Sequence, residues 1–164
     1  MNKAVFIDRD GVINNDHNLY YVFKPEDFKL NDGIIQNIVN LKNAGFLVII
    51  ISNQGGIGKG LYKKEDTEKL HEILKNEIYK AGSKIDEIYY CPHYPDTSQC
   101  LCRKPGSLLI EKAIACFNIA PSISYLIGDS PRDIEAAEKA GINGILVSKN
   151  SNIINVCNKI IETK

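Results

Sequence analysis

Near its start the chain carries an uninterrupted apolar run, Ala4 to Ile7, that stops at Asp8 and Asp10 with one residue between them. Apolar residues without alternation are typical of a strand covered on both faces, as strands are in a parallel sheet. In open α/β sheets, ligands bind beyond the carboxyl ends of the strands, where both aspartates would stand. Two carboxylates this close repel each other unless a cation lies between them or one holds a proton. The stretch predicts a Mg²⁺ site of oxygen ligands, with a strand ending in a polar turn as the alternative.

The composition limits the class of protein. The chain has 164 residues, the size of one domain with one core, and 44% of them are hydrophobic. Its 20 basic and 20 acidic residues balance, which gives no bulk attraction to nucleic acid or to an anionic membrane. We see no apolar run long enough to cross a bilayer and no features of a secretory signal. We therefore expect a single cytoplasmic domain, residues 1–164, and by default a monomer.

Strand-like runs and helical periodicity alternate along the rest of the chain. Residues 46–51 give the strongest buried strand, and the apolar positions of residues 34–44 lie on one helical face that ends at Gly45. Such alternation predicts an α/β three-layer sandwich with a mostly parallel, Rossmann-like sheet. Residues 14–22 are expected to form a loop near the carboxyl edge of this sheet. Further strands are expected at residues 85–90, 124–127 and 141–147, and further helices at 63–81, 106–117, 131–140 and 151–162.

A second polar loop follows the strand at 46–51. It begins with Ser52, Asn53, Gln54 and Gly55. Glycines let the backbone approach an anion closely, and successive N–H groups can form a phosphate-binding concavity. The loop lacks the Gly-Lys-[Ser/Thr] ending of a P-loop, and a flexible turn is the alternative. The pattern favours a phosphate site at the edge where the first strand ends.

The stretch from residue 91 to 102 collects soft metal ligands. Cys91, His93, Cys100 and Cys102 are spaced as C-x-H-x₆-C-x-C. Three thiolates and one imidazole make the closed tetrahedral set that suits structural Zn²⁺, whereas a catalytic zinc would keep one position for water. The alternative is a group of buried thiols beside an unrelated histidine. Because clustered cysteines in a reducing compartment indicate metal rather than disulfides, we expect a zinc-stapled loop.

Two cations, Arg103 and Lys104, come directly after the last zinc ligand, and Pro105 follows them. A loop fixed by zinc would hold this basic pair in place, and such a pair is suited to gripping a phosphate. Two ordinary surface charges are the alternative. The other cysteines, Cys116 and Cys157, fall on expected helices and are interpreted as core or surface residues.

The strand at 124–127 is also followed by carboxylates. Gly128 and Asp129 end it, and Asp133 comes four residues later in a helix that Pro131 opens. The carboxyl ends of parallel strands share one edge of a sheet. Both aspartates should therefore meet those of the first strand, the polar loop and the basic pair. The carboxylates could bind a divalent cation, and the neighbouring hydroxyl and basic groups could bind an anion. Together they indicate a phosphoryl-transfer site.

Four motifs make the chain resemble the haloacid dehalogenase-like phosphohydrolase superfamily. They are Asp8-Arg9-Asp10-Gly11-Val12, Ser52-Asn53, Lys104 and Gly128-Asp129-Ser130-Pro131-Arg132-Asp133. The zinc pattern followed by Arg-Lys-Pro resembles the histidinol-phosphate and heptose-bisphosphate phosphatase group, and residues 13–18 resemble its heptose-bisphosphate members. No segment is long enough for an inserted cap domain, which fits that group. The chain departs from the pattern at Ser52, where threonine is frequent, and at Ser130, where the heptose enzymes often have lysine.

The resemblance implies a mechanism with an aspartyl-phosphate intermediate. Asp8 would attack phosphorus, and Asp10 would protonate the leaving oxygen and then deprotonate the attacking water. Mg²⁺ would bind Asp8, the backbone carbonyl of Asp10, and Asp129. Ser52 and Lys104 would hold the phosphoryl oxygens. We expect Asp133 to orient the Mg²⁺ shell rather than to bind the metal.

The resemblance also implies the substrate, a heptose 1,7-bisphosphate that loses its C7 phosphate. A histidinol-phosphate phosphatase is the first alternative. A non-enzymatic phosphoacceptor domain is the second, but the acid/base at Asp10 would hydrolyse its acyl phosphate quickly. A zinc-dependent nucleic-acid module is the third, and the balanced charge argues against it. The residues expected to contact the substrate are Asp16, His17, Asn18, Leu19, Ser52, Asn53, Gln54, Gly55, Arg103 and Lys104.

Overall fold

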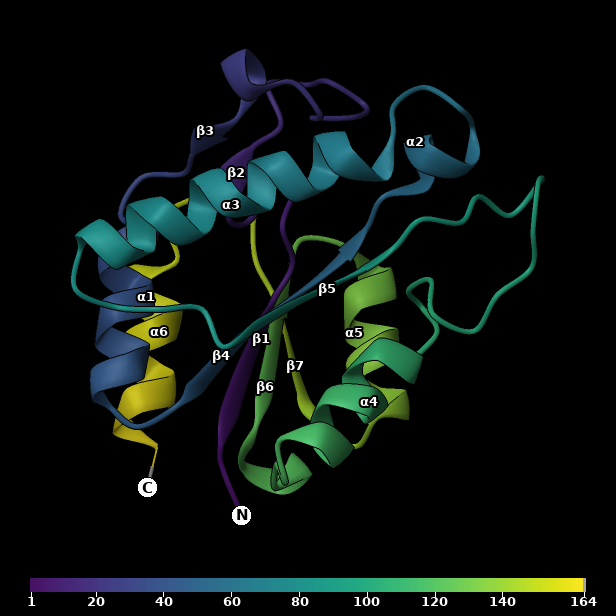
Figure 1. Ribbon diagram of the computed structural model, residues 1–164. Helices are drawn as coiled ribbons and strands as arrows, with labels where there is room; N and C mark the ends of the chain where they lie inside the picture. Colours follow the sequence, from purple (N-terminus) through teal and green to yellow (C-terminus); the bar gives the residue numbers. More distant parts are fainter. Residues whose placement is uncertain (164) are drawn as a thin grey trace.

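Five parallel strands form the centre of the computed structural model, which describes residues 1–163 (Figure 1). These strands are β1 (Ala4–Ile7), β4 (Leu47–Asn53), β5 (Glu87–Cys91), β6 (Tyr125–Gly128) and β7 (Asn143–Leu146). Their order in the sheet is β5-β4-β1-β6-β7, and every neighbouring pair is parallel. The predicted parallel α/β sheet is confirmed, with β1 as its central strand.

Helices cover both faces of the sheet and complete three layers (Figure 1). One layer holds α1 (Ile34–Asn43), α3 (Lys64–Lys80) and α6 (Ile154–Glu162), and the other holds α4 (Leu108–Cys116) and α5 (Pro131–Lys139). All of β1 is fully buried: Val5 and Ile7 belong to the first core, and Ala4 and Phe6 to the second. The side chains alternate as a strand requires, and both faces are apolar.

Shorter elements complete the chain. A one-turn helix, α2 (Gly55–Gly58), follows β4 directly, and 3₁₀ turns cover Pro25–Asp27 and Pro121–Ile123. Within the described residues 1–163, no inserted domain interrupts the sheet and its helices. None of the helices in that range is long and apolar enough to cross a membrane.

The structure corrects one expected loop and two helix starts. The helix expected from residue 106 begins at Leu108. The stretch 14–22 begins with β2 (Asn14–Asn15), which pairs antiparallel with β3 (Lys29–Leu30). Strands of two residues are too short to show a periodicity, so the sequence could not indicate them. The last helix begins at Ile154 rather than at residue 151. The side chain of Asn152 accepts a hydrogen bond from the Ile154 N–H (3.0 Å), a local turn that competes with helical backbone before residue 154.

Candidate active site

A cavity of about 370 Å³ opens at the carboxyl edge of the sheet. Most of the residues that the sequence nominated line it, although they come from segments far apart in the chain. His17 and Gln54 do not: His17 is exposed, and Gln54 is buried below the surface of the cavity. The nominated residues that line the cavity are Asp8, Asp10, Asp16, Asn18, Leu19, Ser52, Asn53, Gly55, Arg103, Lys104, Asp129 and Asp133.

Lys104 lies at the floor of this cavity and is almost completely buried. Its Nζ contacts Asp8 Oδ1 at 2.5 Å and Asp133 Oδ1 at 2.6 Å, and it donates to the carbonyl oxygen of Ile51 at 2.8 Å. Burial alone would lower the pKa of Lys104, but the two carboxylates outweigh it and raise that pKa. The side chain is therefore a fixed ammonium group beside Asp8.

Three carboxylates, those of Asp8, Asp129 and Asp133, bring oxygen atoms within 4.8 Å of one another. Burial raises the pKa of Asp8 to about 7; Lys104 opposes this effect, while Asp133 and Asp129 add to it by repulsion. Burial and the proximity of Asp133 also raise the pKa of Asp129. The charge of Lys104 does not offset this concentration of negative charge. Hard oxygen donors in this state fit a Mg²⁺ ion.

Asp133 has a second task besides its contact with Lys104. Its Oδ2 accepts a hydrogen bond from the backbone N–H of Ser130 (3.0 Å) as part of a capping box that starts α5. Both carboxylate oxygens therefore have protein partners, which is consistent with the expected orienting role.

Gly11 makes room for Asp129. It has a φ of +91°, and a Cβ placed on it would lie 2.1 Å from Asp129 Oδ2. A side chain at this position would therefore be strained and would also push the carboxylate out of place.

Asp10 is held differently from the three clustered carboxylates. Nη2 of Arg9 contacts both of its oxygens at 2.9 Å, and the side-chain amides of Asn14 (3.0 Å) and Gln54 (2.9 Å) also donate to it. Arg9 is fully buried and donates in addition to the carbonyl oxygen of Val22 at 2.7 Å. These donors hold the Asp10 carboxylate in place where it lines the cavity, which is consistent with the expectation that the backbone carbonyl, not the carboxylate, of Asp10 binds Mg²⁺.

Asp16 links the loop after β2 to residues that follow β7. Its carboxylate pairs with Lys149 and accepts hydrogen bonds from Asn150 Nδ2 (2.9 Å) and the Asn18 N–H (3.2 Å). Burial acts to raise the pKa of Asp16, but the hydrogen bonds from Lys149 and Asn150 lower it. Asp16 therefore anchors the loop whose residues Asn18 and Leu19 reach the cavity.

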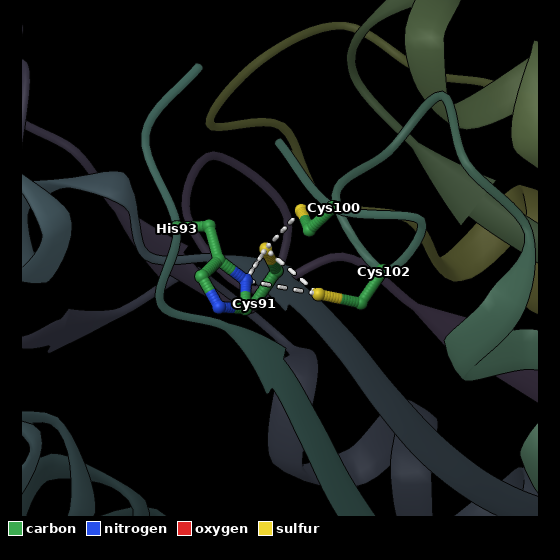
Figure 2. Close-up of side chains that lie close together, drawn as sticks. All are labelled: Cys91, His93, Cys100 and Cys102. Carbon is green, nitrogen blue, oxygen red and sulfur yellow. Dashed lines mark hydrogen bonds between the residues drawn. The ribbon is translucent and has the colours of Figure 1, made fainter. Parts of the chain in front are cut away.

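Figure 2 shows the four expected zinc ligands gathered at the end of β5. The Cys91 Sγ lies 3.6 Å from Cys100 Sγ and 3.2 Å from Cys102 Sγ, and His93 Nδ1 lies 3.2 Å from Cys102 Sγ. Tetrahedral zinc with bonds of about 2.3 Å would place two sulfurs roughly 3.8 Å apart. The Cys91–Cys100 distance of 3.6 Å is close to this value, and the Cys91–Cys102 distance of 3.2 Å is shorter. Burial raises the pKa of the Cys91 thiol, so a bound cation is needed to make it a thiolate. The donor set fits Zn²⁺.

Arg103 connects the zinc loop to the cavity. Its Nη1 donates to the carbonyl oxygen of His93 (3.2 Å), and a Cβ on Gly55 would lie only 2.9 Å from that nitrogen. A second cavity of about 680 Å³ adjoins the zinc loop, and Arg103, Lys104 and Arg132 line both cavities. The three cations therefore stand between the two spaces.

Several residues of the site were not predicted from the sequence. Lys149 follows β7, so the rule that ligands gather beyond strand ends could have indicated it. Arg132 lies within the motif of residues 128–133, but the motif alone indicates no role for it. Arg9 gave no signal, since an arginine between two aspartates is usually expected to be exposed. The cavity residues that the sequence missed are Tyr20, Tyr21, Val22, Ser130, Arg132 and Lys149.

The HAD-hydrolase-like family model matches residues 101–153. A D-glycero-beta-D-manno-heptose-1,7-bisphosphate 7-phosphatase from Haemophilus ducreyi is 39% identical over 148 residues, covering 85% of this chain and 79% of that protein. A bifunctional histidine biosynthesis protein from Legionella pneumophila is 37% identical over 149 residues, covering 91% of this chain but 42% of that protein.

A solved structure shares the fold closely. The D,D-heptose 1,7-bisphosphate phosphatase from B. bronchiseptica, complexed with magnesium and phosphate, has a TM-score of 0.82 and 31% sequence identity. The match covers 88% of this chain and 79% of that one.

Proposed function

The chain belongs to the haloacid dehalogenase-like phosphatases, and we propose that it removes the C7 phosphate of D-glycero-D-manno-heptose 1,7-bisphosphate. The observation that carries this proposal is the pairing of two cavities. The first cavity is lined by Asp8, Lys104 and the carboxylate cluster that would bind a divalent cation. The second cavity adjoins the first, and Arg103 and Arg132 line both. Such a pair of spaces suits a substrate with a phosphate at each end.

In the proposed reaction, a carboxylate oxygen of Asp8 attacks phosphorus and forms an aspartyl phosphate. The alkoxide that leaves takes a proton from Asp10. Asp10 then removes a proton from the water that hydrolyses the intermediate, which releases phosphate and restores Asp8. The buried ammonium of Lys104 and the hydroxyl of Ser52 hold the phosphoryl oxygens, where negative charge is concentrated.

Asp8, the backbone carbonyl of Asp10, and Asp129 would hold Mg²⁺. When bound, the ion would reduce the repulsion between the Asp8 carboxylate and the anionic phosphate. The raised pKa of Asp8 supports this assignment, because burial among two further carboxylates disfavours the ionised form that the attack requires.

The four residues of Figure 2 would hold a structural Zn²⁺. Arg103 and Lys104 follow the last of them directly in the chain, so the metal would fix both cations. We propose that this loop and the loop anchored by Asp16 recognise the substrate in place of a cap domain. Because the three thiols must stay reduced, we also propose a reducing, cytoplasmic location, and a monomer as the working form.

The distal C1 phosphate would lie between Arg103 and Arg132, whose planar guanidinium groups suit bidentate contact with phosphate. Histidinol phosphate is the second candidate substrate, favoured by the similarity to the histidine biosynthesis protein. It carries an ammonium group where the heptose carries its second phosphate. Two arginines at that end favour the bisphosphate.

The experiment that tests the substrate is phosphate release from heptose bisphosphates, histidinol phosphate and p-nitrophenyl phosphate, with phosphorus NMR of the sugar product. We expect the C7 phosphate to be released. Arg103→Ala should lower kcat/KM for the bisphosphate by about tenfold or more and affect p-nitrophenyl phosphate far less. Lys112→Ala, on the outer side of α4, is the control for loss of a charge. Release of the C1 phosphate, or a higher kcat/KM for histidinol phosphate, would overturn the substrate assignment but not the phosphatase.

A further inference from the structure

Gln54 lies in a buried hydrogen-bond chain that ends at Asp10. Its Nε2 donates to Asp10 Oδ2 at 2.9 Å and to Ser52 Oγ at 2.8 Å. Its Oε1 accepts a hydrogen bond from the hydroxyl of Tyr62 at 2.7 Å. Gln54 is 1% exposed and Tyr62 is 6% exposed, and neither is among the residues that line the two cavities. These two side chains act on the site only through other residues.

The hydroxyl of Tyr62 determines which way the Gln54 amide points. Burial, foremost, raises the pKa of Tyr62, so the group stays a hydroxyl and can donate to an oxygen. If the amide were reversed, its carbonyl oxygen would face the carboxylate of Asp10, and its NH₂ group would face Tyr62. Only the observed orientation supplies donors to both Asp10 and Ser52. Without the hydroxyl, the buried carbonyl of Gln54 would lose its partner.

The ring of Tyr62 is held by the loop that borders the cavity. It stacks on Phe23 with 4.8 Å between ring centres and 5° between planes, and it meets the edge of Tyr21 at 5.8 Å. A Cβ on Gly56 would lie 2.1 Å from the ring, so a glycine is needed there. The same loop reaches Asp10 by a second route, because Arg9 binds both the Val22 carbonyl and the Asp10 carboxylate.

On the basis of the proposed phosphatase function, we infer that Gln54 and Tyr62 are positioning residues for the acid/base Asp10. Tyr62 fixes the amide of Gln54, and that amide fixes the plane of the Asp10 carboxylate. The aromatic contacts of Tyr62 tie this orientation to the loop that borders the substrate cavity. Gln54 is therefore assigned to the alignment of the acid rather than to contact with the substrate.

Substrates with different leaving groups separate this role from a general structural one. A sugar alkoxide needs a proton in order to leave, whereas p-nitrophenolate is a weak base and leaves without one. The ratio kcat/KM reports the steps up to departure of the alcohol. The later hydrolysis of the aspartyl phosphate therefore does not affect this ratio. Misalignment of Asp10 should therefore lower kcat/KM for the sugar bisphosphate only. Displacement of Asp8 or Lys104 would lower it for both substrates.

The test compares Tyr62→Phe, Gln54→Met and the double variant with Tyr89→Phe, which removes a hydroxyl from β5 away from the site. We expect Tyr62→Phe to lose about tenfold in kcat/KM for the bisphosphate and less than about threefold for p-nitrophenyl phosphate. Because Tyr62 acts through Gln54, the double variant should match Gln54→Met alone.

Equal losses on both substrates, or additive effects in the double variant, would overturn the inference. Full activity of Gln54→Met would also overturn it. This variant keeps the inference testable if Tyr62→Phe does not fold. The wild-type enzyme tests the proposed function separately. If it releases phosphate from neither substrate, the function fails, whatever the variants do.

Discussion

Replacing Asp8 by asparagine should abolish turnover and yet stabilise the metal-free protein. The amide cannot form the acyl phosphate, so no activity remains. It also cannot ionise, and the ionised Asp8 is unfavourable where it lies, buried beside Asp129 and Asp133. Lys104 keeps its contacts with Asp133 (2.6 Å) and the Ile51 carbonyl (2.8 Å) in the variant, so its charge stays compensated.

The size of the gain follows from the pKa of Asp8. Burial, against the effect of Lys104, raises this pKa from 3.8 to about 7, and at about 1.4 kcal/mol per pKa unit the difference is roughly 4 kcal/mol. Because the folded-state value is the higher one, ionisation favours the unfolded chain, and stability is lost as the pH rises from about 4 to about 7. Asp8→Asn should thus be about 2 to 4 kcal/mol more stable than wild type near pH 8 and nearly equal near pH 4.

Urea unfolding in magnesium-free buffer at these two pH values measures the difference. Asp133→Asn is the matched control. It makes the same chemical change in the same cluster, but it should destabilise the protein, because Asp133 pairs with Lys104 and caps α5. Added Mg²⁺ should stabilise wild type and have little effect on Asp8→Asn. The electrostatic account of this cluster is wrong if Asp8→Asn is less stable than wild type near pH 8. It is also wrong if the variant exceeds wild type in stability by as much near pH 4 as near pH 8.

Three further predictions concern the surroundings of the site. Cys102→Ser should release zinc, measured by elemental analysis, and lower both Tm and kcat, since the loop that carries Lys104 loses its staple; bound zinc with unchanged kcat would contradict this. Gly55→Ala should push the Arg103 guanidinium away and lower kcat/KM for the bisphosphate severalfold but not for p-nitrophenyl phosphate. Burial lowers the pKa of His71 to about 3, so wild type should lose about 1.4 kcal/mol per pH unit as the pH falls below about 6.5. His71→Gln should lack that part of the slope in unfolding measured against pH.

The sequence could predict the edge of the sheet where the site lies, because that depends only on local patterns. Asp8, Ser52 and Asp129 each follow or end a buried apolar strand, and the carboxyl ends of parallel strands must share an edge. The cluster of Cys91, His93, Cys100 and Cys102 could be predicted for the same reason, because all four residues lie within a stretch of twelve. Neither prediction required knowledge of the order of the strands.

What the sequence could not predict depends on contacts between distant segments. The full burial of Arg9 follows from acceptors on the carboxylate of Asp10 and on the carbonyl of Val22, which is reached only after the chain turns back. The hydrogen bond from Tyr62 to Gln54 likewise depends on how α2 packs near the loop that carries Tyr21 and Phe23. No sequence periodicity indicates such contacts, so the sequence indicated no role for Arg9 and predicted that Gln54 contacts the substrate.

The two carboxylate oxygens of Asp133 couple Lys104 to the start of α5. One oxygen pairs with the ammonium group of Lys104, and the other accepts the Ser130 N–H at the first turn of α5. Unwinding the start of α5 would remove one of the three contacts of the Lys104 ammonium, and a shift of Lys104 would disturb the carboxylate that caps the helix. Amide hydrogen exchange in the first turn of α5 should therefore slow whenever the phosphate site is occupied, so a backbone segment outside the chemistry reports on it.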